Sequence, residues 1–342
     1  MTTPAPLAPT ATAPQRPRWL PYAAAVLLLL ALALCSTLIG AVPISLRDLL
    51  GLGAGMADNA HIAQVLFISR VPRTLALALA GASIAVAGML MQMIARNRFV
   101  EPATVGTVGA ASLGMLVVAL LAPGLAPVGK MLVAATFALA ATGLFMLMLR
   151  RLPLRNALIV PLVGLVFAGV VEAVTSFLAY RFDMLQAIRA WTVGDFSTVL
   201  QGRYELLWIS LALTVAAFFA AERFTVIGMG EAVATSLGVH YGRWMALGLL
   251  IVATVTAAVV VTVGVIPFLG LIVPNLVSLW MGDRMRRSVL WVALCGSALM
   301  LACDIVGRLL IRPFEIPIGT IMGVLGSLLF LALLWRKRAE LG

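Results

Sequence analysis

Ten long apolar segments, joined by short polar connections, dominate this sequence of 342 residues. A helix needs about 20 mostly apolar residues to cross the hydrocarbon core of a bilayer. Hydrophobic residues make up 63% of the chain and charged residues only 11%, against roughly 25% in a typical soluble domain. No soluble core can absorb so much apolar surface. The pattern predicts an all-α, polytopic membrane protein with spans at approximately 20–40, 63–95, 103–122, 129–149, 158–180, 204–222, 244–265, 267–281, 288–310 and 317–335.

The termini and the basic residues predict the orientation of the chain. Residues 1–18 are rich in Pro, Ala and Thr and predict a disordered tail, followed by a single membrane domain over 19–338. Ten spans place both termini on the same side of the membrane. If that side is the cytoplasm, 15 of the 24 Lys and Arg residues lie on the cytoplasmic side, where loops of membrane proteins are enriched in basic residues. We therefore expect cytoplasmic N- and C-termini.

Several kinds of chemistry find no support in the sequence. The formal charge of +11 is scattered singly between apolar runs, unlike the clustered basic face of a nucleic-acid-binding protein. The stretch at 124–131 resembles a phosphate-binding loop, but Met131 occupies the position of the Ser or Thr that binds magnesium. His61 and His240 are far apart, and the three cysteines lie in apolar stretches. We expect no metal site, no cofactor bound by this chain, no nucleic-acid partner and no enzymatic activity.

Ionisable residues inside apolar segments are candidate functional positions, because a charge at the bilayer centre costs about 2.5–3.5 kcal/mol. Glu172 falls in the middle of the fifth segment, and Thr175 and Ser176 share its helical face. This face either lines a watery path or forms a hydrogen-bonded helix interface. Asp304 and Arg308 are four residues apart in the ninth segment, which allows an ion pair with either a structural or a functional role.

Small residues and prolines predict how the spans pack. Pro267 and Pro274 bracket the eighth segment, so we expect a short, broken or irregular helix buried among its neighbours. The segment at 63–95 is longer than a bilayer requires and is expected to tilt or to extend beyond it. Small residues at four-residue spacing allow close helix approach in lipid. They are Gly81/Ala85, Gly106/Ala110/Gly114, Gly164/Ala168 and Gly319/Gly323.

The most specific signal is a set of ordered motifs between about residue 65 and residue 335. They are Arg70-Val-Pro-Arg73 with Gly81, Gly88 and Gln92; Asn97-Arg-Phe99 with Glu101-Pro102 and Gly106; Trp191-Thr-Val-Gly194; Gly230-Glu-Ala232 with Leu237-Gly238; and Gly264-Val-Ile-Pro-Phe-Leu-Gly270 with Pro274-Asn275, Asp304, Arg308 and Pro317-Ile-Gly319. In this order the motifs resemble the FecCD-type permease family. Its members are the membrane subunits of ATP-binding-cassette (ABC) importers for ferric siderophores, haem and cobalamin.

The resemblance implies a type II ABC importer permease fold with about ten helices. It implies a transport subunit of the cytoplasmic (inner) membrane that pairs with a second copy of itself or with a related permease. The pair would sit on a dimer of cytoplasmic ABC ATPases, which bind ATP and magnesium. It would receive its cargo from an extracytoplasmic siderophore-binding protein.

The resemblance also assigns residues to a gate and to a translocation path. The loop at Asn97 and Phe99 is similar to the cytoplasmic gate, and a helix cap is the alternative role for Asn97. The face formed by Glu172, Thr175 and Ser176 would line the path.

Two further surfaces follow from the same resemblance. The polar segment 222–243 is similar to the ATPase-coupling loop, and Arg70, Arg73 and Arg308 match positions that dock acidic residues of the binding protein. The alternative for these arginines is interfacial snorkelling, with Arg308 neutralising its neighbour at position 304. In the coupling segment we expect short helices and a tight turn at Gly230, Glu231, Ala232, Leu237 and Gly238.

Departures from the family pattern bear on the substrate. Asn-Arg-Phe at 97–99 stands where the family usually has Asn-Pro-Leu, and Pro274-Asn275 replaces the usual Pro-His. The Pro-Asn variant resembles the branch associated with catecholate-type siderophores, so we expect a permease for a ferric siderophore. The alternatives are import of haem or cobalamin and, in a different class, an ion-coupled secondary transporter that uses Glu172 and Asp304 as proton carriers.

Overall fold

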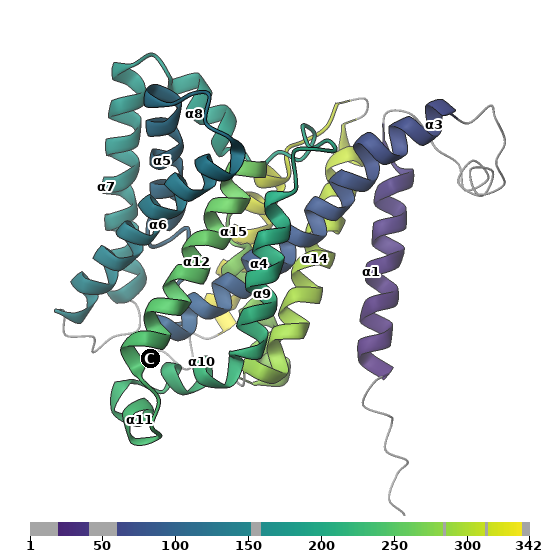
Figure 1. Cartoon of the computed structure of the whole chain (residues 1–342). Coiled ribbons are helices and arrows are strands. Elements are labelled where there is room, and N and C mark those ends of the chain that lie inside the picture. The colour runs from purple at the N-terminus through teal and green to yellow at the C-terminus, as the bar shows by residue number, and fades with distance from the viewer. Residues whose placement is uncertain (1–19, 41–59, 152–158, 283–284, 312–313, 337–342) are drawn as a thin grey trace, which may run out of the picture.

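The computed structural model describes residues 20–40, 60–151, 159–282, 285–311 and 314–336, so the predicted tail at 1–18 lies outside the described residues (Figure 1). Helices make up almost all of this part of the chain, and β pairing within it is limited to one bridge between Val193 and Val265. The helices are α1 (Leu20–Leu38), α3 (Ala60–Val65), the π-helical turn η2 (Leu66–Arg70), α4 (Val71–Ile94), α5 (Thr107–Leu121), α6 (Pro127–Arg150), α7 (Ile159–Arg181), α8 (Leu185–Thr192), α9 (Leu206–Phe219), α10 (Ala221–Gly228), α11 (Glu231–Ser236), α12 (Tyr241–Val263), α13 (Leu269–Met281), α14 (Met285–Leu310) and α15 (Ile318–Arg336).

The helices correspond to the ten predicted spans. By length and composition, six helices in the described residues are able to cross a membrane, and the number rises to seven if α9 and α10, bent by 69° from each other, count as one span. Three shorter apolar helices, α5, α13 and α15, account for the remaining predicted segments. The hydropathy pattern missed α8, because this helix has only eight residues and buries only Ile188. The predicted all-α, polytopic architecture is confirmed.

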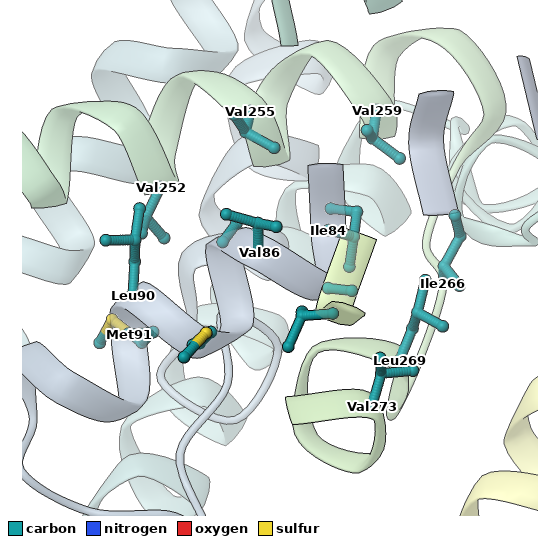
Figure 2. Packing of buried hydrophobic residues seen from close by; sticks show 14 of the residues in the cluster. Ile84, Val86, Leu90, Met91, Val252, Val255, Val259, Ile266, Leu269 and Val273 are labelled. Atoms are coloured by element: carbon teal, nitrogen blue, oxygen red, sulfur yellow. The ribbon is translucent and has the colours of Figure 1, made fainter. Parts of the chain in front are cut away.

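Helix α4 is the centre of the bundle and packs against α14, α12, α13 and α9 (Figure 1). Apart from Arg73 near one end and Gln92 near the other, its residues are apolar or small on every side, and nearly all are buried. A helix that is apolar all round is stable where other helices surround it. Figure 2 shows this core between α4, α12 and the start of α13, formed by Ile84, Val86, Leu90, Met91, Val252, Val255, Val259, Ile266, Leu269 and Val273.

The long second segment is one helical rod of 34 residues, from His61 to Ile94. The wide turn η2 lies just before Pro72, which has no N–H to donate to the carbonyl of Ile68. The backbone N–H of Gln201 donates to this carbonyl at 2.9 Å. This bond attaches the loop after α8 to the η2 end of the rod.

Glycines allow α4 to approach its neighbours at backbone distance. A Cβ added to Gly81 would lie 2.6 Å from the carbonyl oxygen of Gly296 on α14. A Cβ added to Gly88 would lie 2.0 Å from the carbonyl oxygen of Gly270 on α13. Such close approach is typical of helix packing in lipid and was predicted for Gly81. A Cβ added to Gly323, in another predicted pair, would make only an ordinary contact, with its nearest neighbour at 3.9 Å.

Helix α13 is short and largely buried, as predicted, but it is not broken at Pro274, which lies inside a continuous helix. The irregular backbone lies before the helix, where Gly264 has φ +86° and Phe268 has φ +63°.

Side-chain amides explain why α13 continues through Pro274. This proline cannot donate to the carbonyl of Gly270, four residues earlier. Gln92 Nε2 on α4 lies 3.4 Å from the carbonyls of Gly270 and Leu271, and Asn275 Nδ2 donates to Leu271 O at 2.7 Å. Gln92 therefore donates to the carbonyl of Gly270 that the proline leaves without its usual donor.

Candidate functional site

The predicted gate residues lie in the loop 95–106 between α4 and α5, which is named the gate loop after this prediction. The Oδ1 atom of Asn97 accepts the backbone N–H of Phe99 at 2.9 Å, which forms a local turn. Asn97 therefore stabilises the loop itself rather than the first turn of α5, whose N-terminal cap is Gly106. The buried Phe99 ring meets Phe330 of α15 edge-on, with ring centroids 6.2 Å apart.

Glu101 is a candidate residue of this loop to which the sequence analysis gave no role. Its side chain is buried, and Oε1 accepts the N–H of Phe268 at 3.1 Å, at the N-terminus of α13. Burial raises the pKa of Glu101 to about 7, although N–H donors from Phe268, Leu271 and Gly270 act to lower it. The carboxylate beside Pro102 can be seen in the sequence, but the sequence does not show that it bonds to a residue 167 positions away.

A second bond attaches the gate loop to α13. Asn275 Nδ2 donates to the carbonyl of Arg98 at 2.8 Å as well as to Leu271 O of its own helix. The Pro-Asn variation therefore has a packing role in this structure. Together with Glu101, Asn275 fixes the loop at the N-terminus and at the middle of α13.

A buried ion network lies at the other end of α4. Asp304 is 1% exposed, and its Oδ1 accepts two bonds from Arg73, at 3.2 Å from Nε and 2.7 Å from Nη2. Its Oδ2 pairs with Arg308, as the four-residue spacing predicted. Arg73 Nη1 also pairs with the exposed Glu315 at 2.7 Å. Sequence spacing found the pair within α14 and missed the partners from α4 and from the loop before α15.

Two arginines of this region hold the C-terminus of α1. Arg308 Nη1 donates to the carbonyls of Ser36 and Ile39 at 2.8 and 2.7 Å. Arg70 Nη1 donates to the carbonyls of Thr37 and Ile39. Cations at a helix C-terminus stabilise its unpaired carbonyls and its dipole. Arg70, Arg73 and Arg308 are all buried with partners inside the chain, and their role in docking stays a prediction.

The predicted path face on α7 is only partly present. Glu172 and Ser176 are exposed, within a largely apolar exposed surface of the helix. Thr175 is buried and donates its hydroxyl to Val171 O at 2.8 Å, as polar residues in apolar helices often do. The hydroxyl of Thr175 therefore does not share the exposed face of Glu172.

The predicted coupling segment 222–243 contains the short helices and the turn that the sequence predicts. Gly230, with φ +106°, separates α10 from α11. Gly238, with φ +71°, makes the turn after α11 and donates its N–H to Thr235 O at 3.0 Å. Most residues from 231 to 240 are exposed, among them Glu231 and Ala232, while Ala234 and Val239 form a small core with Ile227. Exposed apolar side chains here are Met229, Val233 and Leu237.

Two cavities flank these sites. A cavity of about 390 Å³ lies between α4, α10 and α13, beside the gate loop, and Arg96 and Arg98 line it. A cavity of about 910 Å³ lies among α5, α6, α8, α9 and α12, with side chains of both charges, including Lys130 and Asp195. Within the described ranges, no group of three or more His, Cys, Asp or Glu side chains is placed to hold a metal ion.

A bundle of membrane-spanning helices, with a buried loop at one end of its central helix and an ion network at the other, defines a multi-pass membrane permease. The fold is similar to a metal-chelate type ABC transporter solved in an inward-facing conformation, with a TM-score of 0.75 and 26% identity over 92% of this chain and 98% of that chain. PsaBC from Streptococcus pneumoniae, solved with a Fab, shares the fold at a TM-score of 0.57 and 14% identity, over 80% of this chain and 94% of that chain.

The sequence profile of the FecCD transport family matches residues 27–336. The chain is 43% identical to YclN of Bacillus subtilis (strain 168), a petrobactin import system permease protein, over 92% of this chain and 97% of YclN. It is 42% identical to FatD of Vibrio anguillarum, a ferric-anguibactin transport system permease protein, over 78% of this chain and 85% of FatD. It is 33% identical to the vitamin B12 import permease BtuC of Vibrio cholerae, over 80% of this chain and 83% of BtuC.

The chain belongs to the FecCD transport family. It is a permease subunit of an ABC importer, and not an enzyme. The family resemblance that the ordered motifs indicated is confirmed.

Proposed function

We propose that this chain carries a ferric siderophore across the cytoplasmic membrane as the permease of an ATP-driven importer. Sequence identity supports this proposal. The petrobactin and anguibactin permeases are 42–43% identical to the chain, whereas the vitamin B12 permeases are 32–33% identical. The cargo class rests on these relatives rather than on Asn275, whose amide N–H groups bind backbone carbonyls. A catecholate-type siderophore stays the prediction for the narrower class.

The proposed partners are a cytoplasmic ABC ATPase dimer, an extracytoplasmic siderophore-binding protein and a second permease, either the same chain or a related one. ATP and magnesium would bind the ATPase, and this chain would bind no cofactor. The coupling segment supports an ATPase contact, because Met229, Val233 and Leu237 form an exposed apolar tip on a polar connection. The excess of basic residues on the side of the termini supports cytoplasmic N- and C-termini.

Docking of the binding protein is proposed at the η2 end of α4. Arg73 there is shared between the buried Asp304 and the exposed Glu315. An acidic side chain of a docked protein would take the place of Glu315 on the same guanidinium. Arg70 and Arg308 would act in part through the position of α1, which both hold.

Uptake of labelled substrates tests the proposed function. Cells with and without the gene would be given ⁵⁵Fe complexes of petrobactin, anguibactin and a hydroxamate siderophore, and labelled cobalamin. We expect loss of uptake of at least one ferric siderophore in the deletion strain, unchanged cobalamin uptake, and rescue by the intact gene. Loss of cobalamin uptake alone would favour the vitamin B12 alternative.

The same strains separate ATP-driven import from a secondary transporter. A substitution of the P-loop lysine in the partner ATPase should abolish siderophore uptake, while a protonophore should have little effect on the first minutes of uptake. The opposite pattern would favour an ion-coupled carrier. Asp304 forms ion pairs with Arg73 and Arg308, which supports a structural function for this carboxylate.

A further inference from the structure

Phe268 has a backbone conformation that a bulky residue rarely adopts. Its φ of +63° lies in the left-handed region that favours glycine. Such a conformation persists where its surroundings hold it in place. Here the N–H of Phe268 donates to the buried carboxylate of Glu101 at 3.1 Å. Its side chain packs on Gly326 of α15, where a Cβ would lie only 2.5 Å from the Phe268 Cβ.

The strained backbone places the Phe268 ring in a cluster of three aromatic side chains. Phe268 stacks on Phe330 with ring centroids 6.4 Å apart, and Phe99 meets the same ring edge-on at 6.2 Å. The three rings come from the loop before α13, from α15 and from the gate loop. Beside them, the space lined by Phe99, Phe330 and Asn275 holds about 10 Å³, at the lower limit for one water molecule.

The gate loop and α13 are joined by two bonds that do not depend on the rings. Glu101 receives the N–H at the start of α13, and Asn275 donates to Arg98 O at 2.8 Å. A movement of α13 would therefore carry the loop with it. The contact between Gly88 and Gly270 leaves little space for α13 to shift alone against α4.

We propose that Glu101 is a positioning residue that holds Phe268 in its left-handed conformation, so that Phe99, Phe268 and Phe330 together form the inner seal of the translocation path. The inference rests on the proposed function, because it extends a gate at Phe99 to two further rings and to the carboxylate behind them. Glu101 acts through Phe268 and does not itself touch the transported substrate. The hydrogen bond from Phe268 to Glu101 keeps the seal formed. The seal opens when α13 and the gate loop move together, because Phe268 and Phe99 then leave Phe330 of α15.

Transport stoichiometry tests the proposal. The permease would be reconstituted in liposomes with its ATPase and binding protein, and ATP hydrolysed per ferric siderophore imported would be measured. We expect Glu101→Ala and Phe268→Gly each to raise this ratio at least threefold and to let a small trapped dye leak. Glu101→Gln keeps an acceptor oxygen and should stay within about twofold of the unmodified protein. Phe219→Ala, which removes an exposed ring elsewhere, is the matched control.

The double variant shows whether Glu101 acts through Phe268. Glycine accepts φ +63° without strain, so Phe268→Gly should insert and fold although it loses the packing of the ring. Adding Glu101→Ala to Phe268→Gly should then change the ratio by less than 1.5-fold. Independent, multiplicative effects of the two substitutions, or unchanged stoichiometry in the Phe268→Gly protein, would overturn the proposal. Absence of siderophore uptake by the unmodified transporter would instead count against the proposed function.

Discussion

The charge of Asp304 should make a large electrostatic contribution to the stability of the η2 end of the bundle. The substitution Asp304→Asn keeps the side-chain shape and removes the charge. It leaves Arg73 and Arg308, which are 9% and 5% exposed, beside a neutral group. Both guanidiniums would then be buried with less negative charge than they need.

The loss of stability depends on the contacts that the two arginines keep. Breaking a buried pair by removing one partner costs about 3–5 kcal/mol. Two contacts reduce this cost: Glu315 stays 2.7 Å from Arg73, and Arg308 keeps its bonds to the carbonyls of Ser36 and Ile39. We therefore expect a loss near the lower limit, about 3 kcal/mol of the free energy of unfolding.

The assay is unfolding by sodium dodecyl sulfate in mixed micelles, followed by circular dichroism. The matched control is Glu222→Gln, which breaks an ion pair with Arg286 in which the side chains are 67% and 69% exposed. An exposed pair contributes at most about 1 kcal/mol, so this control should unfold almost as the unmodified protein does. Adding Arg308→Gln to Asp304→Asn removes one unpaired cation and should restore part of the lost stability.

A loss of less than about 1 kcal/mol for Asp304→Asn, equal to that of the exposed control, would show that the charge of Asp304 does not make this contribution. It would mean that water or lipid headgroups already neutralise the buried arginines. A double variant that is less stable than Asp304→Asn alone would refute the assignment of the cost to an unpaired charge.

Three further outcomes follow from the structure. Gly88→Ala should prevent stable insertion, because its Cβ would lie 2.0 Å from a backbone oxygen of α13, whereas Gly143→Ala, with no atom within 4 Å, should be neutral in expression and melting temperature. Gly238→Val should uncouple ATP hydrolysis from uptake while the protein still inserts, because φ +71° strains a β-branched residue in the predicted coupling turn. Gly242→Ala is the control, and undiminished uptake by the Gly238→Val protein would contradict this role. The pKa of Glu101 is about 7 in the folded protein and about 4.5 when exposed, so the folded state holds an extra proton between these values, and the melting temperature in detergent should fall as pH rises from about 5 to about 8. Glu101→Gln should weaken this dependence, and an unchanged pH profile in that variant would contradict the shifted pKa.

The spans and their order were determined by the sequence, because hydropathy acts locally along the chain. About 20 apolar residues must become a helix in lipid, since every backbone polar group has to be satisfied within the segment. The same local rule predicted the pair between Asp304 and Arg308, because residues four apart share a helix face. The turn at Gly238 was predicted for a similar reason, as a polar, glycine-containing interruption between spans.

Contacts between distant segments form the candidate site, and only the tertiary structure shows which segments are in contact. Nothing near Glu101 in the sequence indicates that its carboxylate accepts the N–H of Phe268, just before α13. Nothing near Phe268 indicates a left-handed backbone, and the residues that contact it, Glu101 and Gly326, are distant in the sequence. Arg73 likewise finds Asp304 across 231 positions. In a membrane, hydrophobicity specifies which segments become helices but hardly distinguishes one apolar face from another, so close packing and a few buried polar bonds select the partners.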